Sequence, residues 1–340
     1  MSESTTQNYN HLKIHSQYSI CEGAIKIDDL KEFSKTNKIQ SLGLSDTTNL
    51  CGALEFAEKI SKVGTQPIIG TQINFKFNDT VGLLPLFALD EEGYKRIIKL
   101  SSFSFLNNDE LSEPHLDFNE LLEDTHGVAI LSGTIFGLFG QLFDKGKFTE
   151  IKDLYNKLKE KFGDRFYLEI QRHNDQNELS FEKFNLKKSL ELSIPLIATN
   201  EVFYLNKDMH EAHDALICIG SKTYINDKTR KRYSDQHYLK SNLEMAELFS
   251  DLPEALENNY NFPLRCNFRP LFSNPILPNI SSEKGGNADD ILRKDSLHGL
   301  KDKFHKVFGI KNNEIENNNI FLEYKDRLDH ELSIIIEMKY

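Results

Sequence analysis

The chain has 340 residues, of which 39% are hydrophobic and 27% are charged, a mixture typical of a globular protein with a substantial core. Its 41 basic and 52 acidic residues give a net charge of −11, so the surface as a whole should repel a polyanion, and nucleic acid must be contacted locally or through a partner. The cysteines are scattered along the chain, which excludes a disulfide scaffold. No apolar stretch approaches the roughly 20 residues that cross a bilayer, and no signal-peptide pattern occurs. These two observations exclude a membrane anchor and indicate a cytoplasmic protein.

Strand-like and helix-like patterns alternate over roughly the first 200 residues. Apolar residues at helical spacing, such as Ile27, Leu30 and Phe33, follow a short alternating segment at 11–15. The strands expected in chain order are 11–15, 41–45, 71–77, 83–89, 128–132, 166–170 and 195–199, and the helices are 27–38, 50–60, 93–100, 148–162 and 181–192. This alternation predicts an α/β fold in which helices cover a parallel sheet, and the number of units favours closure into a barrel.

Beyond residue 208 the pattern changes to helices, which we expect at 208–217, 242–249, 288–307 and 324–338. Residues 263–280 hold four of the nine prolines and predict a domain boundary. We therefore expect a polar leader at 1–10, a barrel domain at 11–275 and a helical part at 276–340. The last helical pattern reaches the final residue without a stop signal, which favours an interrupted chain. A cut piece, a gene fragment and a natural short product all remain compatible with it.

Reactive residues in a barrel of this kind lie where strands end and loops begin. The residues at these ends are His15, Glu22, Asp46, Thr47, Gln72, Thr134, Glu201 and Phe203. His11 and His15 cannot share a metal ion, because four residues of strand separate them by about 13 Å. Lys13 lies on the same strand face as His15, and its charged ammonium cannot coordinate a metal.

Three further motifs give weaker signals. The basic run at 228–232 could bind phosphates, but a short run of this kind is more typical of a solvated face. His210 and His213 are three residues apart rather than the four of a zinc-protease helix, so surface histidines are expected there. No Asp-x-Asp pair occurs in the sequence, which removes one common arrangement for paired magnesium ions in a polymerase.

Several segments, taken in order, resemble one known family: HLKIHSQYSICEGAIK, LGLSDTTNLCGALEF, QPIIGTQINF, DRFYLEIQRH, PLIATNEVFYL and HYLKSNLEMAELFSDLPEALENN. From about His11 to its end the chain is similar to the N-terminal region of the alpha subunits of bacterial replicative DNA polymerase III, which starts with a PHP (polymerase and histidinol phosphatase) domain. The resemblance implies a distorted (β/α)7 PHP barrel, followed by the mainly helical start of the polymerase palm and thumb region. It also implies that the polymerase active site lies beyond residue 340.

Metal-binding PHP domains hold divalent ions and hydrolyse phosphoesters, and the resemblance assigns their ligand positions to this chain. Those positions are Lys13, His15, Glu22, Thr47, Gln72, Leu83, Thr134, Glu201 and Phe203. Only His15 keeps the ligand type of the family, while Glu22 and Glu201 are still carboxylates. We therefore expect no metal ion and no catalytic residue in this segment, with His15, Glu22 and Glu201 as weak candidates for residual binding.

Electrostatics supports a degenerate site. A divalent ion among carboxylates supplies positive charge, and removing the ion leaves the carboxylates to repel one another. Lys13 can replace that charge by an ion pair with Glu22 or Glu201, while Leu83 and Phe203 would fill former ligand positions with apolar volume. One histidine and two acids are too few for a two-metal hydrolase.

The resemblance implies a structural module of a DNA-directed DNA polymerase, a nucleotidyltransferase of DNA replication. The barrel would support the rest of the alpha subunit and dock the proofreading exonuclease subunit. The full-length enzyme would use Mg²⁺ and contact primer-template DNA, whereas this segment alone needs no cofactor and should not polymerise. An active PHP phosphoesterase or 3′–5′ exonuclease is the alternative, and it needs ligands that the sequence lacks. An independent DNA-binding protein using residues 228–232 is disfavoured by the net charge of −11.

Overall fold

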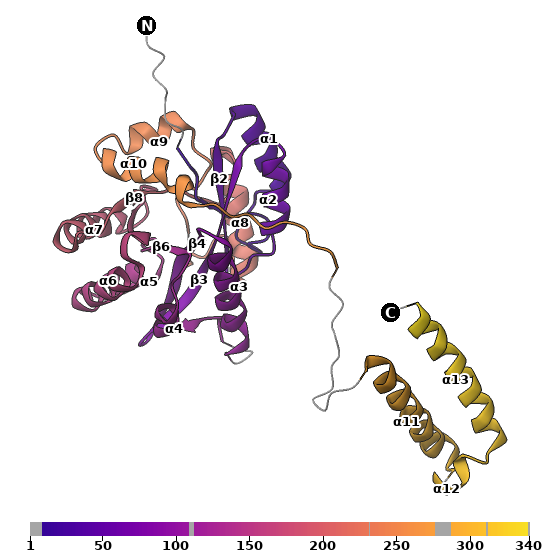
Figure 1. The fold of residues 1–340 in the computed structure, drawn as a ribbon. Coiled ribbons are helices and arrows are strands. Elements are labelled where there is room, and N and C mark those ends of the chain that lie inside the picture. The colour runs from indigo at the N-terminus through magenta and orange to yellow at the C-terminus, as the bar shows by residue number, and fades with distance from the viewer. Residues whose placement is uncertain (1–8, 109–111, 231, 276–286, 311, 339–340) are drawn as a thin grey trace. The chain divides into compact units, whose positions relative to one another are not determined.

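The computed structural model of the chain describes residues 9–108, 112–230, 232–275, 287–310 and 312–338 (Figure 1). The chain divides into two compact units, Met1–Phe272 and Ser273–Tyr340. Most of the expected polar leader at 1–10 lies outside the described residues, and its last two residues, Tyr9 and Asn10, are buried. The expected boundary at 275–276 adjoins residues that are likewise not described.

A curled, seven-stranded sheet forms the centre of the first unit (Figure 1). Its path runs β2-β3-β4-β6-β7-β8, with β5 paired to β3. A separate two-stranded sheet pairs β1 with β9 in parallel. The strands are β1 (Lys13–Ile14), β2 (Ser41–Thr47), β3 (Gln66–Phe77), β4 (Thr80–Ala88), β5 (Leu116–Asp117), β6 (Val128–Leu131), β7 (Phe166–Ile170), β8 (Leu196–Ala198) and β9 (Glu201–Val202).

The prediction of a parallel sheet is wrong for β4, which runs antiparallel to both β3 and β6. Only Asn78 and Asp79 separate β3 from β4, and Asn78 has a φ of 53°. A two-residue connection reverses the chain directly, whereas parallel neighbours need a crossover of a dozen or more residues. The sheet is therefore mixed, and the (β/α)7 count stays a prediction.

The small sheet joins the large one through the segment before β1. The Gly43 amide of β2 donates to the main-chain oxygen of His11 at 2.7 Å. A Cβ atom at Gly43 would lie 2.4 Å from the Leu12 main-chain oxygen, so only glycine permits this approach. The N-terminal segment thus crosses β2 at backbone contact and brings β1 to the edge where the candidate site forms.

Helices cover the sheet of the first unit. Helix α6 buries residues at three- and four-residue spacing, from Ile151 to Phe162, and α9 starts with a capping box of Ser241 and Glu244. The helices of this unit are α1 (Ile27–Asn37), α2 (Ala53–Ser61), α3 (Glu91–Leu106), α4 (Phe118–Glu123), α5 (Leu138–Asp144), α6 (Phe148–Phe162), α7 (Glu178–Leu192), α8 (His210–Ser221), α9 (Asn242–Leu248) and α10 (Pro253–Asn261), with 3-10 turns η1 (Gly163–Arg165), η2 (Lys207–Met209) and η3 (Phe262–Arg265).

The second unit is helical, with α11 (Ala288–Phe308), α12 (Asn312–Ile315) and α13 (Asn319–Glu337). A small core joins α11 to α13, because the Phe304 ring lies 5.3 Å from that of Phe321 and 5.4 Å from that of Tyr324. The helices expected at 288–307 and 324–338 are both present, the latter beginning five residues earlier than expected. Within the described residues, no helix is long and apolar enough to cross a membrane.

Candidate functional site

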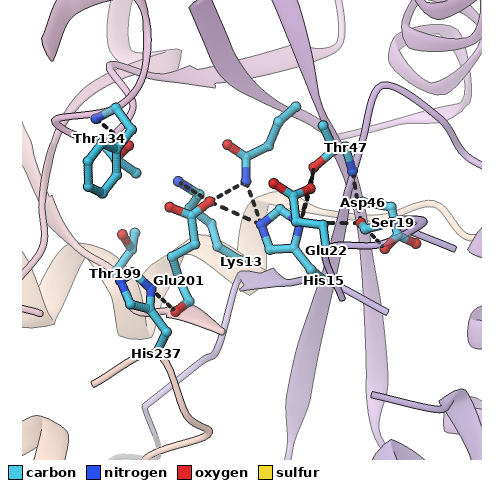
Figure 2. A network of polar contacts seen from close by, with 12 residues as sticks. Lys13, His15, Ser19, Glu22, Asp46, Thr47, Thr134, Thr199, Glu201 and His237 are labelled. Atoms are coloured by element: carbon cyan, nitrogen blue, oxygen red, sulfur yellow. Dashed lines mark hydrogen bonds and ion pairs between the residues drawn. The ribbon is translucent and has the colours of Figure 1, made fainter. Parts of the chain in front are cut away.

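The polar cluster at the carboxyl edge of the sheet is built by β1, β9 and β3. Lys13 and Glu201 are register partners in the parallel β1–β9 pair, so their side chains leave the same face of this small sheet. Gln72, near the middle of β3, and His15, which follows β1, complete the cluster with these two residues (Figure 2). Four of the positions assigned by resemblance therefore meet in space.

The Lys13 ammonium is buried between two carboxylates. Its Nζ atom lies 3.2 Å from Glu169 Oε1 and 3.3 Å from Glu201 Oε1, and the Lys13 and Glu169 side chains are 0% exposed. The ion pair with Glu201 was expected from the sequence, whereas Glu169 was not. Neither contact meets hydrogen-bond geometry, so the attraction is that of charges at close range.

The Lys13 ammonium lowers the pKa of both carboxylates, but their net pKa shifts have opposite signs. Burial raises the pKa of Glu169, and the opposing effects of Lys13 and Thr199 do not cancel it. Burial also opposes ionisation of Glu201, but Lys13, His15 and the Gln72 amide together hold the pKa of Glu201 well below its usual range. Nearby charges and hydrogen bonds therefore outweigh burial at Glu201, whereas burial outweighs them at Glu169.

Both nitrogens of the His15 ring are engaged. Nε2 lies 3.0 Å from Glu201 Oε1 and 2.9 Å from Gln72 Nε2, and Nδ1 lies 3.3 Å from the hydroxyls of Ser19 and Thr47. Phe203 covers the ring, with a centroid separation of 4.5 Å. The imidazole is thus held in place on each edge and on one face.

Three further assigned positions, Glu22, Leu83 and Thr134, lie around this cluster, and we call this outer part of the site the rim. The Glu22 side chain is 23% exposed, accepts a hydrogen bond from Thr47 Oγ1, and approaches His15 Nδ1 to 3.8 Å. Leu83 is half-buried opposite Asn74 on β3, two residues beyond Gln72. Thr134 accepts a hydrogen bond from the Phe136 amide and lines a small pocket together with Glu169.

Two acidic residues of the site, Glu169 and Asp46, are not among the ligand positions that the resemblance assigns, although Asp46 was expected at a strand end. Glu169 is a carboxylate within the otherwise apolar strand Phe-Tyr-Leu-Glu-Ile of β7, which is the sequence signal that could have found it. Asp46, at a strand end, accepts hydrogen bonds from the Ser16 amide and the Ser19 hydroxyl, each at 2.7 Å. Burial raises the pKa of Asp46. Asp46 fixes Ser19, which in turn contacts His15.

A pair of stacked histidines adjoins the cluster. The rings of His173 and His237 have centroids 4.1 Å apart and planes 3° apart. Burial lowers the pKa of each to about 4. His237 Nδ1 contacts the main-chain oxygen of Glu201 at 3.1 Å (Figure 2). The histidine pair therefore directly borders the polar cluster of Lys13, His15, Gln72 and Glu201, which we call the Lys13 cluster.

The structure corrects the prediction that His213 is a surface histidine, and it shows what Arg230 of the basic run at 228–232 contacts. His213 is 3% exposed and its Nε2 contacts the Glu22 main-chain oxygen at 2.8 Å, so it is not a surface histidine. In the basic run, Lys231 is not described, but Arg230 makes two 2.6 Å hydrogen bonds to the carboxylate of Asp214. This bidentate pair ties the loop to α8, which is a structural use of the run.

Stability in acid should depend on Glu201. Because its pKa is lowered on folding, the carboxylate contributes stability above the unfolded pKa of about 4.3, and this contribution is lost as the pH falls further. We expect Glu201→Gln to show a shallower loss of unfolding free energy than the wild type between about pH 5 and pH 3. Urea unfolding at each pH measures these slopes. Glu22→Gln, at the rim, is the control, and equal slopes for wild type and Glu201→Gln would contradict the prediction.

Comparison with known proteins identifies the family. Residues 11–173 match the PHP domain. The chain is 39% identical over 332 residues to the DNA polymerase III subunit alpha of Rickettsia conorii, covering 97% of this chain and 28% of that protein. The proteins of the same name from Caulobacter vibrioides and Pseudomonas aeruginosa are 34% and 31% identical, with 100% and 98% of this chain and 30% and 29% of those proteins covered.

The chain therefore spans less than a third of the length of these relatives. The PHP match and the 39% identity over 97% of this chain agree with the resemblance seen in the sequence. The chain belongs to the family of N-terminal, PHP-containing regions of bacterial DNA polymerase III alpha subunits.

Proposed function

We propose that this chain is the front segment of a replicative DNA polymerase, and that its PHP domain serves as a scaffold without a catalytic metal centre. The observation that carries the proposal is the buried Lys13 ammonium between Glu169 and Glu201. The positive charge that family members obtain from bound ions is supplied here by a side chain.

The donor set does not fit the metal centre that the family implies. The Lys13 ammonium occupies one ligand position, and the His15 ring already contacts partners through both nitrogens. A divalent ion about 5 Å from that ammonium would be repelled by about 7 kcal/mol at an effective dielectric constant of about 20. Of the assigned carboxylates, Glu201 is paired with Lys13, and Glu22 lies at the rim. No hydrolytic step is therefore assigned to this site.

The wider role follows from the family. We propose that the catalytic carboxylates, with Mg²⁺ and primer-template DNA, belong to the part of the polymerase beyond residue 340. The barrel at 11–275 would support that part, and the helices at 276–340 would begin the palm and thumb region. Docking of a proofreading exonuclease subunit and a cytoplasmic location are part of the same proposal.

Metal content and nuclease activity together test the degenerate site. The purified chain, dialysed against Mn²⁺ or Zn²⁺ and freed of excess metal, should hold no ion whose binding depends on Glu22, and it should release no nucleotides from single-stranded DNA. The physical reason is that one imidazole and one rim carboxylate are too few ligands for two-metal hydrolysis.

The matched variant for this test is Glu22→Ala, which removes the most accessible carboxylate of the assigned positions. Wild type and Glu22→Ala should give the same background in both assays. Two or more tightly held ions in the wild type, together with DNA cleavage that Glu22→Ala abolishes, would overturn the proposal in favour of an active PHP phosphoesterase or exonuclease.

A further inference from the structure

The end of α8 and the loop after it carry a local excess of positive charge. This stretch, residues 219–232, holds five basic residues and one acidic residue, and we call it the basic loop. Its net charge is +4 in a chain whose net charge is −11. Such a contrast favours a negatively charged partner at this place. Since a short basic run is often only a solvated face, the charge alone does not define a binding site.

The basic loop is folded back on α8. The Arg230 side chain is 5% exposed and donates two hydrogen bonds of 2.6 Å to the Asp214 carboxylate of α8. Arg230 Nε also donates to the main-chain oxygen of Ile225 at 3.4 Å. A turn precedes this contact, in which the Asp227 amide donates to the main-chain oxygen of Tyr224 at 3.0 Å. These bonds give the loop a defined shape, so its exposed side chains are held on one short stretch of surface.

Three apolar side chains of the basic loop face water. Ile219 is 70%, Tyr224 is 84% and Ile225 is 60% exposed. Exposed apolar residues that are scattered singly need no explanation, but three within seven positions form a patch, and exposed apolar patches are typical of interaction sites. The tyrosine ring is the largest of the three, and nearly all of it is open to a partner.

Cationic side chains flank the apolar ones. Lys222 and Lys228 are exposed on either side of the turn at 224–227. Arg232 is also exposed, and its Nε atom lies 3.6 Å from the Asp214 carboxylate, which already pairs with a buried arginine. Because one carboxylate faces two guanidinium groups, this part of the surface keeps a net positive charge. Proteins that bind single-stranded nucleic acid combine these two features, with cations along the phosphates and an aromatic ring against a base.

An unpaired strand fits the exposed tyrosine better than a duplex does. The bases of a duplex are stacked on one another, and only their edges are open in the grooves, so a flat ring finds no base face to contact. The bases of a single strand offer their faces, and stacking on a tyrosine ring tolerates any base.

We propose that the basic loop binds single-stranded DNA, with Tyr224 stacked on a base and the exposed cations on phosphates. The overall charge of −11 repels the rest of the strand, so the contact is weak and short, and the chain is not an independent DNA-binding protein. The contact is separate from the primer-template site proposed beyond residue 340. It is also independent of the scaffold proposal, because none of its residues belongs to the Lys13 cluster or to the rim.

Fluorescence anisotropy of a labelled oligothymidylate, titrated with the purified chain, tests the contact. The affinity should fall about 15-fold between about 50 mM and about 200 mM salt, because about three neutralised phosphates of a single strand give a logarithmic slope of about −2. Tyr224→Ala should weaken binding about fivefold or more, since it removes the stacking surface. Tyr224→Phe keeps the ring and should bind as the wild type does.

A matched pair of lysine variants tests the phosphate contacts. Lys228→Gln should weaken binding and reduce the salt slope by about 0.7. Lys62→Gln removes the same charge from an exposed side chain at the end of α2, outside the basic loop, and should leave both the affinity and the slope unchanged. Circular dichroism of each variant distinguishes loss of binding from loss of folding.

Two results would overturn the inference. A wild-type chain that gives no salt-dependent change in anisotropy would show that the negative charge of the molecule outweighs the basic loop. Equal affinities of the wild type and Tyr224→Ala would show that no base stacks on the ring, and the surface would then suit an acidic protein instead of a nucleic acid strand.

Discussion

Replacing Lys13 with methionine is expected to lower the free energy of unfolding by about 3–5 kcal/mol at pH 7, because it leaves buried carboxylates without their counter-charge. Methionine keeps the length of the side chain and removes the ammonium that lies within 3.3 Å of Glu169 and Glu201. The cost should shrink as the pH falls, since protonation of the two carboxylates removes their repulsion. Urea unfolding of the purified chain at several pH values measures both effects.

A double-mutant cycle separates the ion pair from packing. Lys13→Met combined with Glu201→Gln should be more stable than the sum of the two single changes predicts, because the double variant leaves no unpaired charge at that contact. Lys13→Met combined with Glu22→Gln, by contrast, should show no coupling energy. A cost for Lys13→Met below about 1 kcal/mol, with no coupling to Glu201, would remove the electrostatic basis of the scaffold proposal.

Replacing Asn259 with alanine is expected to cost about 3 kcal/mol or more, because it leaves several buried backbone groups without partners. Asn259 is 0% exposed at the end of α10. Its Oδ1 accepts the Asn10 amide at 2.8 Å, and its Nδ2 donates to the main-chain oxygens of Asn10 and Ala198 at 2.9 and 3.0 Å. One side chain therefore joins the N-terminal segment to β8 and α10.

The neighbouring residue provides the control. Asn258 Nδ2 makes a single bond to the Leu196 main-chain oxygen at 2.7 Å, so Asn258→Ala should cost only about 1 kcal/mol. Thermal unfolding of the two variants compares them directly. A similar, small effect of both changes would show that water replaces the bonds of Asn259 without loss.

Local periodicity was enough to place most elements of the fold. Helix α6 and strand β7 begin and end at the expected residues, because each has an unbroken apolar pattern between clear boundaries. The direction of β4 was not predictable from alternation alone, since it depends on the turn at Asn78 and Asp79. Strand pairing is a tertiary property that a pattern of period two does not encode.

Four residues of the candidate site, Lys13, His15, Gln72 and Glu201, were predicted from the resemblance to the family, and strand register explains one of their contacts. Lys13 and Glu201 meet because β1 and β9 pair in register. Glu169 was missed, since a single acid in an apolar strand does not reveal which residue it will face. His173 and His237 come from irregular segments far apart in the chain, where no periodicity fixes side-chain positions.

The passage of the N-terminal segment across β2 has a consequence for synthesis on the ribosome. Residues before β1 emerge first, yet Asn10 bonds with Asn259, which lies 249 positions later. The opening strand therefore cannot reach its native place until nearly all of the first unit has been translated. Until then β1 also lacks β9, its partner strand, and an unpaired strand of this kind invites pairing with other nascent chains.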